Sequence, residues 1–211
     1  EVFYQSADRS GGDWVWYEER GEGKTVVILA DVMGHGPGPA IITGVMAGAH
    51  KSLSRHSQSV PQMMREINET LFQVTKGSIW TTCIALEFDA NDKSVSITNA
   101  GAPLISIAKR GERTPAVINL PSLPLGSVDT KIAEQKFAFL PGERLMICTD
   151  GAFEFRSKGR PFGRRRLVRL FGNSMGEDAG AAMNKIEGTL RDARDEAPDD
   201  DTTIVVVEAL R

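Results

Sequence analysis

The stretch TVVILADVMGHGPGPA, residues 25–40, decides the fold because it joins an apolar run, an acid, a glycine-rich loop and a helix start. The β-branched and aliphatic residues 25–30 predict a buried strand. Asp31 ends this run, and glycines then stand at positions 34, 36 and 38, with prolines at 37 and 39. Pro39 suits the first turn of a helix. The stretch therefore predicts a strand that delivers one carboxylate to an unusually free loop.

Short strands dominate the rest of the chain. The expected strands cover residues 2–6, 14–19, 25–30, 82–89, 94–100, 104–108, 131–140, 144–149 and 202–210. Turn signals such as ANDK and RGER separate several of them, which favours antiparallel hairpins over βαβ units. Four helices are expected: one that begins at Pro39, one over 61–72, one over 164–171, and one from about 180 to 196. Ser59 and Gln62 would form a capping box for the helix over 61–72. We expect an α+β fold of two mainly antiparallel sheets between helices, in one domain.

The composition excludes several classes of protein. The 211 residues are 41% hydrophobic and 25% charged, as in ordinary globular proteins. A net charge of −3 argues against a dedicated nucleic-acid binder, and no apolar run is long enough for a membrane helix. Cys83 and Cys148 lie in apolar stretches without a CxxC motif, so we expect buried free thiols in a reducing compartment. Because the chain begins with Glu1, we expect a fragment of a longer protein.

Acidic residues stand at the ends of four expected strands. Asp31 and Asp150 follow strands directly, whereas Asp13 and the run 199–201 precede strands. Each acid alone is an ordinary turn former. If these strand ends converge, the carboxylates repel one another unless a cation joins them, and oxygen ligands select magnesium or manganese. The loop GHGPGP lacks the glycine and lysine pattern of nucleotide-binding loops, which argues against a nucleotide site.

Several motifs in order then resemble a known family. They are SGGD at 10–13, DVMGHG at 31–36, NAGAP at 99–103, PLG at 124–126, LPGERLMICTDG at 140–151, FGRRRL at 162–167 and DDDTTIVVV at 199–207. Together they resemble the PPM-type (protein phosphatase 2C-like) metal-dependent protein serine/threonine phosphatases, in particular the SpoIIE/RsbU-like bacterial branch. The resemblance implies a four-layer α-β-β-α sandwich spanning residues 1–211. It also implies hydrolysis of phosphoserine or phosphothreonine by a metal-activated water.

The resemblance assigns roles to individual acids. Asp31 would bridge two divalent cations, Mn²⁺ or Mg²⁺, and the Val32 backbone carbonyl would help to hold one of them. Asp150 and Asp200 would ligate the second cation, and Asp13 would contact a metal directly or through water. The choice of Asp200 over its neighbour follows from the family pattern D-D-x-T, in which the first acid is the ligand.

Two further candidates surround the expected metal site. His35, in the glycine loop, could protonate the leaving oxygen, or it could be a solvated loop histidine. Arg9 could bind the substrate phosphate through its guanidinium fork, or it could be an ordinary surface residue.

A basic stretch forms a separate candidate. Between Arg156 and Arg169 there are seven basic residues and no acid. This stretch could be a solvated face. Alternatively, Arg164, Arg165 and Arg166 could form a docking surface for an acidic or phosphorylated protein.

The resemblance also implies partners. The substrate would be a phosphorylated regulatory protein of the anti-sigma-factor antagonist type, and a sensor domain would precede this one in the same parent chain. Partner or homodimer contacts could be needed to order the metal site. The expected location is the cytoplasm, including the cytoplasmic part of a membrane-attached sensor.

Two alternatives stay open at this point. Trp16 and Ala102 depart from the family pattern and leave room for a catalytically silent regulatory domain. The second alternative is a metal-dependent phosphoesterase that acts on small molecules.

Overall fold

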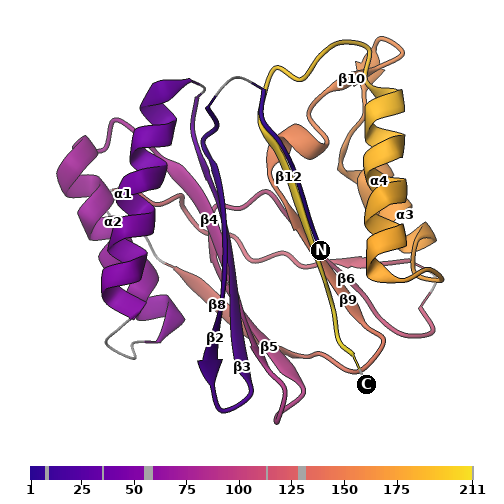
Figure 1. Ribbon diagram of the computed structural model, residues 1–211, viewed down its shortest axis with the longest axis horizontal. Helices are drawn as coiled ribbons and strands as arrows, with labels where there is room; N and C mark the ends of the chain where they lie inside the picture. Colours follow the sequence, from indigo (N-terminus) through magenta and orange to yellow (C-terminus); the bar gives the residue numbers. More distant parts are fainter. Residues whose placement is uncertain (8–9, 35, 55–58, 113, 128–131, 211) are drawn as a thin grey trace. The chain divides into compact units, whose positions relative to one another are not determined.

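The computed structural model describes two compact units, each built from separate segments of the chain (Figure 1). The described residues are 1–7, 10–34, 36–54, 59–112, 114–127 and 132–210. Unit 1 combines Glu1–Arg9, Pro103–Asn119 and Phe139–Arg211, and unit 2 combines Ser10–Ala102 and Leu120–Ala138. Each unit contains one five-stranded sheet with antiparallel pairing. The predicted preference for antiparallel hairpins is therefore confirmed.

The sheet of unit 2 has the strand order β2-β3-β4-β5-β8. Its strands are β2 (Asp13–Gly21), β3 (Lys24–Val32), β4 (Thr81–Asp89), β5 (Ser94–Ala100) and β8 (Ala133–Ala138). The helices α1 (Pro37–Leu53) and α2 (Val60–Thr75) lie side by side in Figure 1 and pack on this sheet. Alternate residues of β3, including Val26, Ile28 and Ala30, form a core with the apolar faces of both helices.

Helix α1 begins at Pro37, slightly earlier than the predicted Pro39, whereas α2 begins directly after Ser59, the predicted cap. Gly36 caps α1 at φ 89°, a backbone conformation that favours glycine, and prolines occupy the first turn. Ser59 caps α2, but its side chain makes no capping hydrogen bond. The predicted capping box is therefore wrong in its hydrogen bonding, although the helix start is right.

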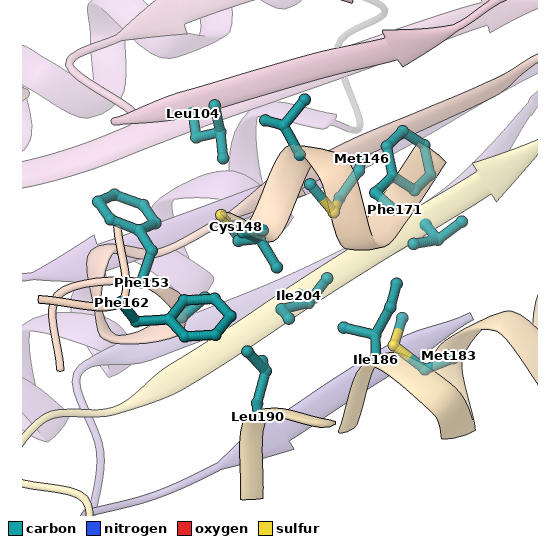
Figure 2. Close-up of a cluster of buried hydrophobic side chains, with 14 of the residues drawn as sticks. Leu104, Met146, Cys148, Phe153, Phe162, Phe171, Met183, Ile186, Leu190 and Ile204 are labelled. Carbon is teal, nitrogen blue, oxygen red and sulfur yellow. The ribbon is translucent and has the colours of Figure 1, made fainter. Parts of the chain in front are cut away.

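The sheet of unit 1 has the strand order β1-β12-β9-β6-β7. Its strands are β1 (Val2–Gln5), β12 (Thr202–Glu208), β9 (Arg144–Cys148), β6 (Leu104–Ala108) and β7 (Ala116–Val117). The first strand of the chain therefore pairs with the last. The helices α3 (Arg164–Asn173) and α4 (Ala179–Ala193) bury one core with β6, β9 and β12 (Figure 2).

Short elements connect this sheet to its helices. A 3₁₀ turn, η2 (Asp150–Ala152), follows β9, and β10 (Arg156–Ser157) pairs with β11 (Arg160–Pro161) just before α3. Phe155 and Phe162 stack across this hairpin with ring centroids 4.7 Å apart. Both rings belong to the buried core of unit 1, so the hairpin is anchored by apolar contacts as well as by its backbone.

Several expectations about single residues now have an outcome. Cys83 and Cys148 are buried and free, as predicted. His50 is only 1% exposed, because it lies under two tryptophans of β2. Helix α4 ends at Ala193 rather than near 196, because Arg194 adopts an extended conformation. Among the described residues, no helix combines the length and the apolar composition needed to cross a membrane.

Candidate active site

The first pair of candidate carboxylates lies in unit 2. Asp13 begins β2 and is the direct cross-strand partner of Asp31 on β3. Asp31 is inside the strand rather than after it, because β3 continues to Val32. Directly opposed residues have Cβ atoms about 4.5–5.5 Å apart, and like charges at such positions destabilise a sheet. The sequence therefore spends stability to bring two carboxylates together at this edge.

The backbone around this pair is closely packed. The Val32 amide donates a hydrogen bond to the Gly12 carbonyl over 3.2 Å, and the Thr43 hydroxyl donates to the same carbonyl over 3.1 Å. A Cβ atom at Gly12 would lie 2.6 Å from the Val32 carbonyl oxygen, so no larger residue fits without a shift. The SGGD and DVMGHG motifs are thus in contact, and α1 is tied to both through Thr43.

The second pair of carboxylates lies in unit 1. Asp150 begins η2 at the end of β9, and Asp200 precedes β12, which is hydrogen-bonded to β9. Partial burial, together with the negative charge of Asp150, raises the pKa of the Asp200 carboxyl. The two carboxylates therefore interact, and the charge of Asp150 disfavours the ionised form of Asp200.

One oxygen of this second pair indicates a missing ligand. Asp150 Oδ1 is buried and has no hydrogen-bond partner among the described residues. A buried carboxylate oxygen without a donor is costly, and a neighbouring carboxylate adds to that cost. A hard divalent cation would compensate both charges through oxygen ligation. The residues of unit 1 thus fit the divalent cation that the resemblance implies.

The three consecutive aspartates before β12 have different surroundings. Asp199 is exposed to solvent. Asp201 is buried, and its Oδ1 accepts hydrogen bonds from the Ser6 hydroxyl over 3.1 Å and from the Ala7 amide over 2.9 Å. Asp201 therefore holds the chain that leaves β1, whereas Asp200 interacts with Asp150.

The structure does not describe two of the residues that the sequence analysis selected. Arg9 and His35 lie outside the described residues. In the part of the chain that the structure describes, no group of three or more Asp, Glu, His or Cys side chains is close enough to hold a metal ion. Asp13 with Asp31 and Asp150 with Asp200 each form a pair, one in each unit.

Two residues beside the unit 1 pair were missed from the sequence. Arg194 Nη2 donates hydrogen bonds to the Gly151 carbonyl over 2.8 Å and to Thr202 Oγ1 over 2.7 Å. A Cβ atom at Gly151 would lie 2.1 Å from the Asp201 carbonyl oxygen. The DG dipeptide signalled only a turn at this glycine, and no local pattern marked Arg194, because its partners are distant in sequence.

The basic stretch is exposed where it enters α3. Arg164, Arg165 and Arg166 form the first turn of this helix, and all three are solvent-exposed. The guanidinium of Arg164 lies 5.0 Å from the ring centroid of Phe153, and that of Arg166 lies 5.9 Å from the ring centroid of Phe162. None of the three forms an ion pair with a residue that the structure describes. Their charge is therefore available to a partner.

Comparisons with known proteins agree with these features. The family model described as "Stage II sporulation protein E (SpoIIE)" matches residues 21–210. The phosphoserine phosphatase RsbP of Bacillus subtilis (strain 168) is 26% identical over 159 residues, which cover 73% of this chain and 39% of RsbP. The chain thus spans well under half the length of this relative.

Solved structures share the fold. The SiaA-PP2C domain of Pseudomonas aeruginosa superposes with a TM-score of 0.88 at 18% identity, over 99% of this chain and 85% of that domain. The catalytic domain of the serine/threonine phosphatase PstP, solved with two manganese ions, superposes with a TM-score of 0.73 at 16% identity, over 100% of this chain and 97% of that one. These likenesses confirm the predicted α+β sandwich class. Because the family model spans nearly the whole sequence, the chain belongs to the SpoIIE family.

Proposed function

We propose that this chain hydrolyses phosphoserine or phosphothreonine on a regulatory protein, with Mn²⁺ or Mg²⁺ as cofactor. The observation that carries the proposal is the buried Asp150 Oδ1, which lacks a hydrogen-bond donor among the described residues while its neighbour Asp200 carries a raised pKa. The relative RsbP is named a phosphoserine phosphatase, and PstP was solved with two manganese ions. Both facts support the proposed chemistry.

The proposal gives each carboxylate a task. Asp31, Asp13 and the Val32 carbonyl would hold cation from unit 2, and Asp150 and Asp200 would hold cation from unit 1. When bound, a divalent metal supplies a nucleophilic water at neutral pH and stabilises charge on phosphoryl oxygens. We count Asp31 and Asp150 as catalytic in this sense. His35 as the acid for the leaving oxygen and Arg9 as a phosphate ligand stay predictions.

The surroundings of the aspartates before β12 support Asp200 as the ligand. Asp201 is already engaged by Ser6 and Ala7, so its carboxylate is held by the chain itself. Asp200 accepts one backbone hydrogen bond, from the Asp201 amide over 2.9 Å, and this bond orients its carboxylate. A ligand that is oriented before the cation arrives binds it at a lower entropic cost.

The substrate would be recognised as a protein. The exposed first turn of α3, with Arg164, Arg165 and Arg166, offers guanidinium groups that bind carboxylates and phosphates in a fork. We propose this turn as a docking surface for an acidic or phosphorylated regulatory protein of the anti-sigma-factor antagonist type. A sensor domain in the parent chain, a homodimer and a cytoplasmic location belong to the same proposal.

Hydrolysis of p-nitrophenyl phosphate and of a phosphoserine peptide tests the proposal. We expect turnover with Mn²⁺ and none with chelator. Replacement of residues that support metal ligands lowers activity by up to ~100-fold. Because Asp31→Asn and Asp150→Asn change the ligands themselves, each should lower turnover by more than that. Asp92→Asn is the matched control, because it removes an aspartate charge that is not assigned to the metal site. Asp92 lies in the turn between β4 and β5, is exposed, and forms an ion pair with Lys136 of β8.

The outcomes separate the alternatives. Mn²⁺ binding by calorimetry without turnover on any phosphoester would favour the silent regulatory domain. Turnover of a phosphorylated metabolite combined with inertness toward phosphopeptides and phosphoproteins would favour the small-molecule esterase. Equal activity of Asp150→Asn and wild-type protein would overturn the assigned site.

A further inference from the structure

Arg194 connects the two chain segments that carry the acids of unit 1. It is the first residue after α4, and its side chain turns back toward η2 and the start of β12. One nitrogen, Nη2, donates to both the Gly151 carbonyl and Thr202 Oγ1, at 2.8 and 2.7 Å. Thr202 Oγ1 in turn donates to the Gly151 carbonyl over 3.2 Å. These three groups form a closed hydrogen-bonded triangle.

This triangle is covalently next to the proposed ligands. Gly151 directly follows Asp150, and Thr202 lies two residues after Asp200. The two backbones touch here, since a Cβ atom at Gly151 would overlap the Asp201 carbonyl oxygen. Because the peptide planes are packed without space, a small rotation at Gly151 moves the Asp150 carboxylate relative to Asp200.

A second set of contacts fixes the guanidinium from the other side. Arg194 Cζ lies 4.3 Å from the ring centroid of Phe155. The next residue, Asp195, accepts hydrogen bonds from the amides of Lys158 and Gly159, both over 2.7 Å, and its own amide donates to the Arg156 carbonyl over 3.1 Å. The end of α4 is therefore attached to the β10–β11 hairpin, and both elements appear next to each other in Figure 1.

Only an arginine can make this combination of contacts. A guanidinium is planar, so it stacks on an aromatic ring and donates in its plane at the same time. A lysine ammonium would keep the charge but would lose the stacked plane and the fixed direction of donation. The contacts therefore argue for a geometric task rather than for charge alone.

We propose that Arg194 is a positioning residue that sets the relative orientation of Asp150 and Asp200, and thereby the affinity of unit 1 for a divalent cation. This inference rests on the proposed function only for the identity of the ligand. Residues that orient metal ligands from outside typically change metal affinity by 10–100-fold when they are replaced.

Mn²⁺ affinity measured by calorimetry tests the proposal. We expect Arg194→Lys to weaken binding by ~10-fold or more. Arg191→Lys is the matched control, because Arg191 is on the same helix with a side chain that is 72% exposed. Thr202→Val removes the shared hydroxyl at nearly constant volume and should weaken binding in the same direction. The double variant should lose less than the two single effects combined, because both changes break one triangle.

Hydrogen exchange in the metal-free protein provides a readout that does not depend on activity. The amides of Phe153 and Glu154 both donate to the Asp150 carbonyl, over 2.9 and 2.8 Å. Arg194→Lys should speed exchange at these amides, while the amides of α1 in unit 2 should exchange as in wild type. A purely global destabilisation would speed exchange in both places.

Three outcomes would decide whether Arg194 positions the metal ligands. Mn²⁺ affinity within twofold of wild type in Arg194→Lys, with unchanged exchange at Phe153 and Glu154, would overturn the inference. If Arg194→Lys fails to fold, Thr202→Val alone decides it by the same two measurements. The wild type could also bind Mn²⁺, and the variants could show these changes, while the wild type hydrolyses no phosphoester. That result would overturn the proposed function and leave the positioning role of Arg194 intact.

Discussion

At the scale of single residues, the candidate site sets function against stability. Asp200 illustrates this conflict. Its pKa is raised by partial burial and by the charge of Asp150, so folding favours its neutral form. A carboxyl whose pKa is higher in the folded state than in the unfolded state costs stability as the pH rises above the unfolded value, about 3.9. At neutral pH without metal, the carboxylate of Asp200 should therefore destabilise the protein.

Asp200→Asn should consequently be more stable than wild type in chelator at pH 7. Asparagine keeps the oxygen that accepts the Asp201 amide but removes the charge. Although its carboxyl is partly desolvated, the residue as a whole is exposed, so solvent screens its charge and we expect a rise in melting temperature of only about 2 °C. Asp192→Asn, with a side chain that is 81% exposed, is the control and should not change the melting temperature. A lower melting temperature for Asp200→Asn would show that the carboxylate supports the fold.

His50 predicts a pH dependence that is separate from the metal site. It is buried in α1 with the rings of Trp14 and Trp16 at 5.5 and 5.6 Å. Burial lowers the pKa of His50, and the positive charges of Arg20 and Lys51 lower it further. The carboxylate of Glu18, 3.8 Å away, raises the pKa but does not cancel the lowering. The unfolded chain therefore takes up the proton more readily than the folded chain.

The stability of the protein should fall as the pH falls through the unfolded histidine pKa, about 6.5. Urea unfolding of metal-free protein between pH 8 and pH 5 measures this dependence. His50→Leu cannot ionise, so its unfolding midpoint should vary less over this range than that of wild type. Identical pH slopes in the two proteins would show that other groups cause the dependence.

At the scale of elements, α3 begins with charges that oppose its own helix. Arg164, Arg165 and Arg166 occupy the first turn, where the helix dipole favours acids over bases. Each misplaced charge costs ~0.3–1 kcal/mol at low ionic strength. The helix dipole therefore gives these three residues no stabilisation, which agrees with the proposed docking role.

Reversal of these three charges to glutamate should therefore separate docking from folding. We expect the triple variant to unfold at a higher temperature than wild type, because glutamate suits the first turn of a helix. Its turnover of an acidic phosphoprotein should fall, whereas its turnover of p-nitrophenyl phosphate should stay unchanged. Equal loss on both substrates would contradict the docking surface.

Two glycines of unit 2 should respond in opposite directions to alanine. Gly12→Ala places a Cβ atom 2.6 Å from the Val32 carbonyl oxygen and should cost ~1–3 kcal/mol of stability, as overpacking does. Gly44 lies inside α1 with open space around it, so Gly44→Ala should add ~0.5–1 kcal/mol. Urea unfolding measures both. A neutral Gly12→Ala would show that the SGGD and DVMGHG motifs can separate at low cost.

The elements that the sequence predicted well are those with local causes. The apolar run 25–30, the prolines in the first turn of α1 and the turn dipeptides all act over a few residues, so strands and helices could be assigned from them. The two-residue strands β7, β10 and β11 have no such pattern and were missed. The inclusion of Asp31 inside β3 was missed for another reason, because pairing with β2 and β4 extends that strand to Val32.

At the scale of the whole molecule, the separation of contacting residues along the sequence explains what could and could not be predicted. The motifs identified Asp13, Asp31, Asp150 and Asp200 one at a time, because each stands beside a recognisable strand. Their pairing depends on strand register, which connects residues far apart in sequence. The role of Arg194 depends on its hydrogen bond to Gly151, more than forty residues away in sequence. A local sequence pattern cannot predict such a contact.

Metal removal offers the test at this scale, because a ligand that binds only the folded chain stabilises all of it. Mn²⁺ at 100 times its dissociation constant should add ~2.7 kcal/mol to the free energy of unfolding. EDTA should remove that increment. The measurement is thermal and urea unfolding with Mn²⁺ or chelator, with Asp92→Asn as a control that keeps the full increment.

Variants in the two units then show which carboxylates supply the binding energy. If each pair of carboxylates binds a cation, Asp31→Asn and Asp150→Asn should each lose part of the Mn²⁺ increment. Loss in Asp150→Asn alone would assign the measured binding to unit 1, where Asp150 Oδ1 has no donor among the described residues. An increment that survives in both variants would mean that Mn²⁺ binds elsewhere, and the assignment of these four carboxylates would then be wrong.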